Sequence, residues 1–491
     1  MKNIIIVTLL FFCASLTHTM KAQQQVDRLV FWLHGLGGDL NGWKKVSQVT
    51  DYASTFSSVQ GFPRRKIFSP ELEYVLFQNS MDQASISVKS SIQNADPFNT
   101  TFNTTFNITD RTRNFVIAHS MGGLVARNLD RMYAQGNASE RRIGGIVTFG
   151  TPHQGAKILN NKDMFTSFAQ GMCSELTAGF IEETIERNFF FDLITSGSSV
   201  RQLFVENACT PLAQLVPSLF NNFTPPITND FSVGALKLNE INAFQSNIPK
   251  VAFWGKETPG SEMWRQLSSL LLQRPTDFPA FEAPDNKLLD FRNSAIQVYQ
   301  DKVTFYQTFY DNRSYCNWWQ WWLFPLDCSW NAHLLDEARD IRDEYQKGLN
   351  WINNANDQWK IIIGAKRFDE VISNGYECEC QDYDYDGNAY GGSFTTVVEN
   401  INDCQGNGWL QSCSPTGNMT TFTTYVPVDE ASDGIVVESS AKNFPQGANI
   451  LPTPTREMTG SNHQQMRNDN NTRNSLFELF EGQHGLYFRT N

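Results

Sequence analysis

The stretch that decides the fold is NFVIAHSMGGLVARNL, residues 114–129. Its first part, up to Ala118, is a largely apolar run that is typical of a buried parallel strand. From Leu124 the apolar residues recur at helical spacing, and this pattern ends at Gly136, a common helix terminator. Between the two patterns lies Ser120, followed by Met and two glycines. The stretch therefore predicts an abrupt turn from strand to helix with a serine hydroxyl at its apex.

Three other segments repeat the apolar strand pattern, at residues 27–43, 143–155 and 248–257. The first two end in turns rich in glycine and other small residues. Strand, helix and strand in this order imply right-handed crossovers in a parallel sheet. We therefore expect an α/β fold built on a mostly parallel sheet.

Composition and the first residues restrict the class of protein. The 491 residues, 41% hydrophobic and 18% charged, suffice for one large or two modest hydrophobic cores. The net charge of −12 argues against a general affinity for nucleic acid, because like charges repel. Residues 1–22 combine Lys2, a short apolar run and a polar end at Ala22, which is the pattern of a cleaved export signal. We expect the protein outside the cytoplasm: secreted, periplasmic or at the cell surface.

The cysteines agree with export. Removal of Cys13 with the signal leaves eight, and an even number in an exported chain indicates disulfides. Because eight cysteines allow 105 pairings, we predict only the neighbours in sequence. These are Cys173 with Cys209, Cys316 with Cys328, and pairs within the cluster of Cys378, Cys380, Cys404 and Cys413. Zinc is not favoured, because the spacing in CEC is too short and no histidine is close.

Two insertions interrupt the strand pattern. Residues 156–247 are Phe-rich with helical character, and we expect them to cap the sheet. Apolar residues recur every three or four positions across 285–312 and 331–359, which predicts two long helices in an antiparallel hairpin. The chain thus divides into a signal peptide (1–22), the first part of the core (23–155), a helical cap (156–247), a core strand (248–257), an insertion with the hairpin and a Cys-rich loop (258–422), and the last part of the core (423–491).

The serine at the apex of the predicted turn has a chemical use. A serine hydroxyl is a poor nucleophile unless a base takes its proton and hydrogen-bond donors stabilise the resulting oxyanion. A sharp turn lifts the hydroxyl clear of the sheet and aims backbone N–H groups at the reacting oxygen. The string AHSMGG thus fits a nucleophile elbow at Ser120, with Ala118 in place of the usual first glycine. The alternative is that small residues merely allow tight packing here.

Two neighbouring motifs favour the chemical interpretation. LHGLGG ends an earlier strand, where an oxyanion-hole loop is expected, and FGTPHQG ends the strand after the elbow. The backbone N–H groups of Leu36 and Met121 are the candidate oxyanion donors. Together the three segments resemble α/β-hydrolase lipases and esterases, particularly secreted bacterial triacylglycerol lipases and related serine esterases. The resemblance covers about 27–155 and 426–468 and leaves the two insertions outside.

The resemblance implies a catalytic triad. In that superfamily the nucleophile, the acid and the histidine follow in this chain order, and the acid commonly lies in a short DG-valine motif. SDGIVVESSA places Asp433 in such a motif, and TGSNHQQMRN supplies His463 in a similar histidine loop. The resemblance thus implies Ser120 as nucleophile, Asp433 as acid and His463 as base.

The residues alone leave alternatives. Glu257 is the alternative acid, because it directly follows a predicted strand, and Asp433 has the simpler interpretation of a turn residue before glycine. His484 is the alternative base, because it is one of the few histidines outside the motif loops. His119 and His153 are expected to be structural hydrogen-bonding residues.

The predicted hairpin tip is rich in tryptophan. The residues are Trp318, Trp319, Trp321, Trp322 and Trp330, in and just after the segment 316–328. Indole rings favour the boundary between apolar and wet regions, so the tip is a candidate contact with a lipid interface. The alternative is ordinary packing on the cap or on a partner subunit.

An acidic segment of the second insertion is a candidate calcium loop. In DYDYDGNAYGGS, Asp382, Asp384 and Asp386 alternate before a glycine, an arrangement in which carboxylates can converge on Ca²⁺. The twelfth position is Ser393 instead of the usual Glu, and the alternative is a solvated acidic turn. No other cofactor is expected.

These features together predict a hydrolase of carboxylic esters, small or lipid, whose acyl group is apolar because the cap is Phe-rich. An acyltransferase would use the same triad to pass the acyl group to an alcohol other than water. A third interpretation is a binding or adhesion protein that keeps the fold without the catalysis.

Overall fold

The computed structural model describes residues 30–36, 38, 42–43, 46, 80–94, 114–168, 226–271, 286–406, 410–445 and 455–489. The predicted signal peptide, most of the predicted cap and the predicted pair Cys173–Cys209 lie outside the described residues. The chain divides into two compact units, residues 1–365 with 431–491 and residues 366–430, and each is described by itself.

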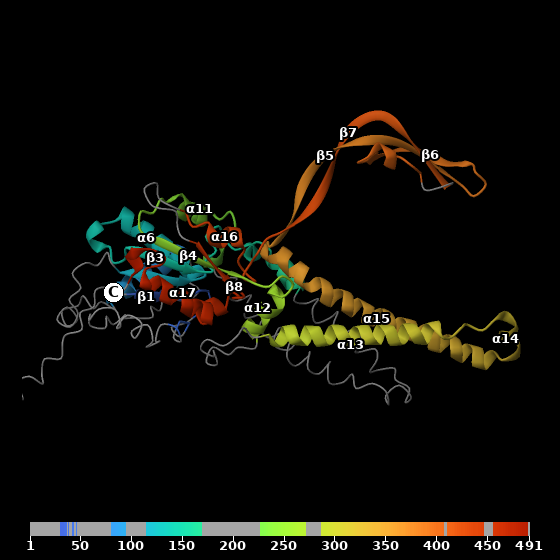
Figure 1. The fold of residues 1–491 in the computed structure, drawn as a ribbon, viewed down its shortest axis with the longest axis horizontal. Coiled ribbons are helices and arrows are strands. Elements are labelled where there is room, and N and C mark those ends of the chain that lie inside the picture. Colours follow the sequence, from blue (N-terminus) through green and yellow to red (C-terminus); the bar gives the residue numbers. More distant parts are fainter. Residues whose placement is uncertain are drawn as a thin grey trace, which may run out of the picture. The chain divides into compact units, whose positions relative to one another are not determined.

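A five-stranded sheet forms the centre of the larger unit (Figure 1). Its strands run β1-β2-β3-β4-β8 across the sheet, and every neighbouring pair is parallel. The strands are β1 (Val30–Leu33), β2 (Phe115–His119), β3 (Gly145–Phe149), β4 (Lys250–Lys256) and β8 (Thr455–Thr459). Since all five are parallel, their carboxyl ends meet at one edge of the sheet, and the loops that follow them gather there.

Helices cover both faces of this sheet. Helix α6 (Met121–Gln135) follows β2, and with α4 (Met81–Asn94) and α12 (Glu262–Leu271) it contributes to the larger hydrophobic cluster on one face. Helix α17 (Asn470–Glu481) packs Leu476 and Phe480 into a second cluster. Successive residues of β2 point to opposite faces of the sheet: Val116 is part of the first cluster, and Ile117 is part of the second. The predicted α/β class with a parallel sheet is therefore confirmed.

The described parts of the predicted cap are short elements. They include η3 (Lys157–Leu159), α10 (Pro226–Asn229) and α11 (Leu236–Ala243), and residues 162–168 are also helical. Leu238 and Ile241 of α11 are buried in the larger cluster. The remaining small elements are η2 (Ala138–Glu140), α16 (Glu438–Lys442), η7 (Gln465–Arg467) and η8 (Leu486–Phe488).

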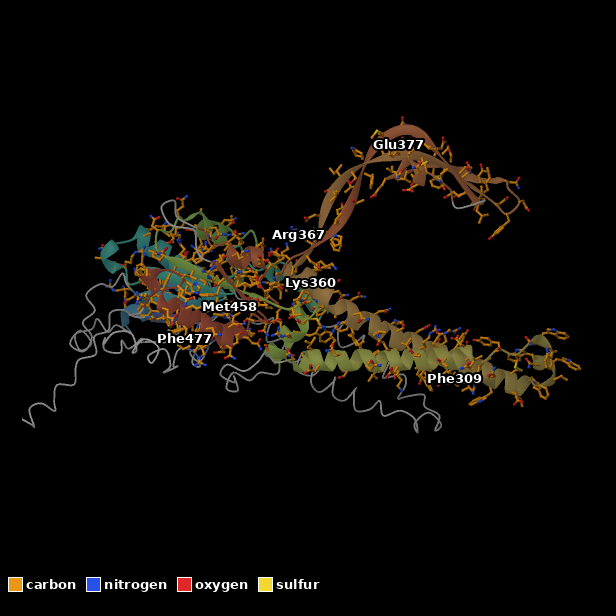
Figure 2. The ribbon with its side chains drawn as sticks, viewed as in Figure 1. Phe309, Lys360, Arg367, Glu377, Met458 and Phe477 are labelled. Carbon is orange, nitrogen blue, oxygen red and sulfur yellow. A yellow bond between two sulfur atoms is a disulfide. The ribbon has the colours of Figure 1, made fainter. Side chains whose placement is uncertain are left out.

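A long helical hairpin extends from α12. It consists of α13 (Lys287–Asp311) and α15 (Pro325–Ile363), with the short α14 (Trp318–Leu323) at the tip (Figure 1). Side chains line it from Lys360 near its root to Phe309 near its tip (Figure 2). No helix in the described part of the chain combines the length and apolar character needed to cross a bilayer.

The second helix of the hairpin is longer than the periodic segment 331–359. It begins at Pro325, because proline fits the first helical turn, and it ends before Gly364, whose left-handed backbone conformation caps it. Where the two helices pack, Gly348 leaves room for the ring of Tyr299. The predicted disulfide Cys316–Cys328 is confirmed and closes the tip.

The smaller unit is an antiparallel sheet of three strands in the order β6-β5-β7. The strands are β5 (Lys366–Tyr383), β6 (Ala389–Val398) and β7 (Gln411–Asp429), with η5 (Ile401–Asp403) after β6. Disulfides Cys378–Cys404 and Cys380–Cys413 confirm pairing within the predicted cluster.

This sheet changes one expected boundary. Residues 423–430 were expected in the last part of the core, but they belong to the smaller unit. The reason is their pairing with β5, in which Val426 lies opposite Asp369. The larger unit resumes only at residue 431.

Candidate active site

Ser120 lies between the end of β2 and the start of α6 in a strained backbone conformation. Its φ is 54° and its ψ is −130°, and it is the one non-glycine residue of the described chain with a positive φ. Such strain persists only where the surroundings fix it. The Ser120 N–H donates to the carbonyl of Phe149 at 2.9 Å, and its own carbonyl accepts from the Thr151 hydroxyl at 2.9 Å. The strain is therefore held by the neighbouring strand β3.

Three glycines allow the turn to pack this closely. A Cβ on Gly35 would lie 2.8 Å from the Cβ of Ser120, and a Cβ on Gly122 would collide with the carbonyl of His34. A Cβ on Gly123 would collide with the Thr151 side chain. The two glycines of HSMGG thus bring the start of α6 against the ends of β1 and β3.

His463 connects Ser120 to Asp433. The imidazole Nε2 is 2.9 Å from the Ser120 hydroxyl, and Nδ1 is 2.8 Å from Oδ2 of Asp433. Since the carboxylate oxygen can only accept, Nδ1 carries the hydrogen, and Nε2 is left to accept the serine proton. Both His463 and Asp433 are buried, at 5% and 1% exposure. The three residues chosen from the sequence therefore form one hydrogen-bonded series, in a geometry suited to activation of the hydroxyl.

A tight turn fixes the carboxylate of Asp433. Its Oδ1 accepts backbone hydrogens from Ile435 at 3.0 Å and from Val436 at 2.7 Å, which leaves Oδ2 directed at the histidine. Gly434 takes a φ of +92°, a conformation that favours glycine. The DG motif thus orients the acid through its backbone.

Two glycines at the ends of strands leave room for the side chains of Asp433 and His463. Gly150 follows β3, and a Cβ there would lie 2.9 Å from Oδ2 of Asp433 and 3.2 Å from Nδ1 of His463. Gly255 is in β4, and a Cβ there would lie 2.7 Å from the Cβ of Asp433. Sequence analysis did not identify either residue as part of the site. The sequence does show a glycine at or near the end of each of these two predicted strands, and a glycine in that place can indicate that another part of the chain packs closely there.

His119 supports the histidine loop. Its Nε2 donates to the backbone carbonyl of His463 at 2.7 Å, and the two rings lie 4.8 Å apart. Burial lowers the pKa of His119 well below its usual value, and His463 acts in the same direction. His119 is therefore a neutral donor to the loop, which agrees with the structural role expected for it.

His153 is also a buried structural residue. Its Nε2 is 3.1 Å from the Thr148 hydroxyl, and the Arg127 guanidinium donates to its carbonyl at 3.2 Å. Burial and the nearby guanidinium hold the pKa of His153 well below its usual value. The TPH loop is thus fixed to α6 by Arg127.

The candidate oxyanion donors lie on the two segments that meet at Ser120. Met121 is the first residue of α6, where a backbone N–H has no carbonyl partner within the helix. Leu36 follows β1 in the loop whose Gly35 packs against Ser120. Both residues are therefore next in sequence to residues at the turn, Met121 to Ser120 and Leu36 to Gly35.

The alternative acid, Glu257, and the alternative base, His484, contact residues outside the Ser120–His463–Asp433 series. Glu257 pairs with Arg265, and its other carboxylate oxygen has no hydrogen-bond partner within the described chain. His484 lies between Arg456, at 3.1 Å, and Glu478, at 3.1 Å. The structure therefore brings neither of them into the series with Ser120.

The predicted calcium residues lie in the smaller unit. Asp384 accepts backbone hydrogens from Asp386 at 3.0 Å and Asn388 at 2.8 Å, and these bonds hold the pKa of its carboxyl below the usual value. Asp382 accepts from Gln411 at 2.8 Å. Over the described ranges, no group of three or more His, Cys, Asp or Glu side chains is arranged to hold a metal ion. The carboxylate of Asp384 thus bonds the turn between β5 and β6, and that of Asp382 bonds a side chain of β7.

One family model matches part of the larger unit. Residues 26–252 match the family described as the PGAP1-like alpha/beta domain. The match ends within β4, so it spans the strands β1 to β3, the elbow and the TPH loop. With the parallel sheet and the serine at its turn, the match indicates an α/β-hydrolase fold for the larger unit. No curated protein sequence matches the chain.

Several solved structures are distantly similar. Phospholipase PlaB from Legionella pneumophila, solved with thio-NAD, is 10% identical over 88% of this chain and 93% of that chain, with a TM-score of 0.29. Lipase 1 from Pelosinus fermentans is 17% identical over 48% and 70%, with a TM-score of 0.26. The lipase BlEst2 from Bacillus licheniformis is 11% identical over 49% and 69%, with a TM-score of 0.26. With TM-scores this low, none of these similarities bears on the function of this chain.

Proposed function

We propose that this protein is an exported serine hydrolase that cleaves carboxylic esters of apolar acyl chains through an acyl-enzyme intermediate. The observation that carries the proposal is the hydrogen-bonded series from Ser120 through His463 to Asp433. The strained elbow and the α/β-hydrolase fold support it, because that fold presents a nucleophile in this way.

In the first half of the reaction, Ser120 attacks the ester carbonyl while His463 takes its proton. Asp433 holds the imidazole in the required tautomer and balances the charge that develops on the ring. The backbone N–H groups of Leu36 and Met121 stabilise the oxyanion. His463 then gives the proton to the leaving alcohol, and the acyl group stays on Ser120.

In the second half, water replaces the alcohol. His463 takes a proton from the water as it attacks the acyl-enzyme, and the same backbone donors stabilise the second oxyanion. Collapse of this intermediate releases the carboxylic acid and returns the proton to Ser120. No metal or organic cofactor is required for either half.

Covalent labelling tests the nucleophile and the reaction class together. A fluorophosphonate should label the wild-type protein at Ser120 alone, and Ser120→Ala should take up no label. The wild-type protein should hydrolyse chromogenic esters in a chain-length series with a preference for apolar acyl groups. If intact protein neither reacts with the probe nor hydrolyses any ester, the proposal is wrong and a binding function is favoured.

The tip of the hairpin supports a lipid interface as the place of action. Trp318 and Trp322 of α14 are 84% and 81% exposed, and Leu326 is 85% exposed. No residue of α14 is buried, and the Cys316–Cys328 disulfide holds the tip closed. Indole rings partition to the boundary between hydrocarbon and water. Because the net charge is −12, we expect zwitterionic rather than anionic lipid.

A pair of double variants tests this contact. Trp318→Ala with Trp322→Ala should weaken binding to phosphatidylcholine vesicles and slow hydrolysis of an emulsified ester, while hydrolysis of a soluble ester stays unchanged. Tyr385→Ala with Tyr390→Ala is the matched control, because these rings are 81% and 75% exposed but lie in the smaller unit. Equal losses on soluble and emulsified esters would assign the tryptophans to folding instead.

A further inference from the structure

The loops that carry the acid and the histidine are both attached to the end of β4. The N–H of Glu257 donates to the carbonyl of Ser432 at 2.8 Å, next to Asp433. The N–H of Gly460 donates to the carbonyl of Lys256 at 2.7 Å, three residues before His463. The position of the acid relative to the histidine therefore depends on this strand end.

A buried guanidinium links the same two places a second time. Arg265, on α12, pairs through Nη1 with the carboxylate of Glu257 and donates through Nη2 to the carbonyl of Gly460 at 2.7 Å. The exposures of the two side chains are 6% for Arg265 and 0% for Glu257. The planar guanidinium thus bridges the end of β4 and the start of the histidine loop.

Helix α12 also touches each loop through other atoms. The Asn462 side chain donates to the carbonyl of Arg265 at 3.3 Å and to the Ser269 hydroxyl at 2.7 Å. On the acid side, a Cβ on Gly434 would lie 3.0 Å from the Cβ of Gln266. The helix that presents Arg265 is therefore packed against both the acid turn and the histidine loop.

Stability alone gives no reason for this ion pair. Burying two charges is costly, and well-packed apolar side chains are often at least as stabilising. Within the described chain, Oε1 of Glu257 and Nε of Arg265 have no hydrogen-bond partner, so the pair is incompletely satisfied. Burial raises the pKa of Glu257 to about 8, although Arg265 acts in the opposite direction. A role in positioning the two loops would explain why Glu257 and Arg265 are buried although their burial is unfavourable.

We propose that Glu257 and Arg265 are positioning residues that hold the acid turn and the histidine loop at the separation which the Ser120–His463–Asp433 series requires. The catalytic consequence rests on the proposed function, whereas the effect on the two loops does not. Neither residue contacts the reacting atoms, so Glu257 is assigned a role different from the alternative acid expected from the sequence.

Replacing both ionisable side chains by apolar ones gives the variant that is simplest to interpret. Glu257→Leu with Arg265→Met should fold, because no unpaired charge stays buried. Its kcat on a soluble ester should fall roughly 10- to 100-fold, since a misplacement of about 1 Å can cost that much, while KM changes little. Arg265→Lys keeps the charge but not the planar bridge, so its kcat should lie between those of the wild type and the double variant.

Hydrogen exchange separates this proposal from the proposed function. In the double variant, peptides covering 431–437 and 457–468 should exchange faster than in the wild type, while peptides of α6 stay unchanged. Arg131→Met is the matched control, because Arg131 is 9% exposed and pairs with Asp82 at 3.3 Å. It should leave both loops protected and kcat unaffected.

The outcomes distinguish the two proposals. Faster loop exchange in a protein whose wild type has no esterase activity would support the positioning role and overturn the proposed function. Wild-type loop protection in the folded double variant would overturn the positioning role, whatever the wild-type activity.

Discussion

The two sheets of this protein are stabilised in different ways. In the five-stranded sheet, β1, β2 and β3 are buried at every position, with apolar clusters on both faces. In the three-stranded sheet, β6 and β7 have no buried residue, and the buried cluster consists of Cys378, Cys380 and Cys404. Apolar burial therefore supports the first sheet, and covalent bonds support the second.

This difference has a consequence for function. The proposed site requires atoms from several loops at hydrogen-bond distance, and only a closely packed scaffold positions them that well. In the larger unit, glycines bring strand ends into contact around the site. In the smaller unit, Gly387, Gly391, Gly392 and Gly417 have open space where a Cβ would be. A substitution at a closely packed position of the larger unit should therefore lower activity, and one of the same type at these open positions of the smaller unit should not.

The largest difference is expected for the aspartates. Asp433→Asn should lower kcat about 10⁴-fold with the fold intact, because the amide no longer selects the tautomer in which Nε2 accepts the serine proton. Asp384→Asn is the control in the smaller unit, where the carboxylate also accepts two backbone hydrogens. It should leave ester hydrolysis unchanged. Steady-state kinetics on a soluble ester measure both, and near-normal turnover by Asp433→Asn would require another acid.

The next difference is expected for the glycines. Gly255→Ala should lower kcat/KM roughly 100-fold, because its Cβ would lie 2.7 Å from the Cβ of Asp433 and would displace the acid. Gly392→Ala, which meets open space, should have no effect on activity. Kinetics with thermal melting as a check on folding measure the pair. Equal activities would mean that the strand end can move without disturbing the site.

A smaller effect, on stability alone, is expected for the disulfides. Cys380→Ser with Cys413→Ser removes a bond that closes a separation of 33 residues, which stabilises the folded state by about 3 to 4 kcal/mol in the chain-entropy estimate. Residues 366–430 should become sensitive to limited proteolysis while hydrolysis of a soluble ester is retained. Cys316→Ser with Cys328→Ser is the control, which should leave that segment protected. Loss of activity in the first variant would show that the site depends on the smaller sheet.

The sequence predicted best what is encoded locally. Ser120, Asp433 and His463 each lie in a short motif whose turn geometry follows from adjacent residues, and the structure places them in one series. The parallel sheet followed from apolar runs that are buried on both faces. The strands and the serine turn depend on neighbours in the chain. Asp433 and His463 were implied by the resemblance to lipases and esterases, because the residues alone also allowed Glu257 and His484.

Features that depend on contacts between distant segments were missed. The pairing of Glu257 with Arg265 joins a strand end to a helix, and neither residue has a motif that indicates the other. The closeness of Gly150 and Gly255 to Asp433 arises only when β3 and β4 align. The boundary at residue 423 was placed too early, because local sequence does not reveal that this segment pairs with β5.

The last prediction concerns the pH dependence of stability that Glu257 causes, which we expect to leave activity unaffected at constant pH. Burial raises the pKa of its carboxyl from 4.5 to about 8, so between these values the folded state holds a proton that the unfolded state has lost. Arg265 opposes this rise, while Asp433 and Glu262 add to it. The contribution to stability is therefore complete below pH 4.5 and is lost as the pH rises to about 8. Glu257→Gln lacks this titration, so urea unfolding from pH 5 to 9 should show the wild type losing stability relative to the variant. A constant difference across that range would mean that Glu257 is already ionised in the folded state at pH 5 and that the ion pair overcomes the cost of burial.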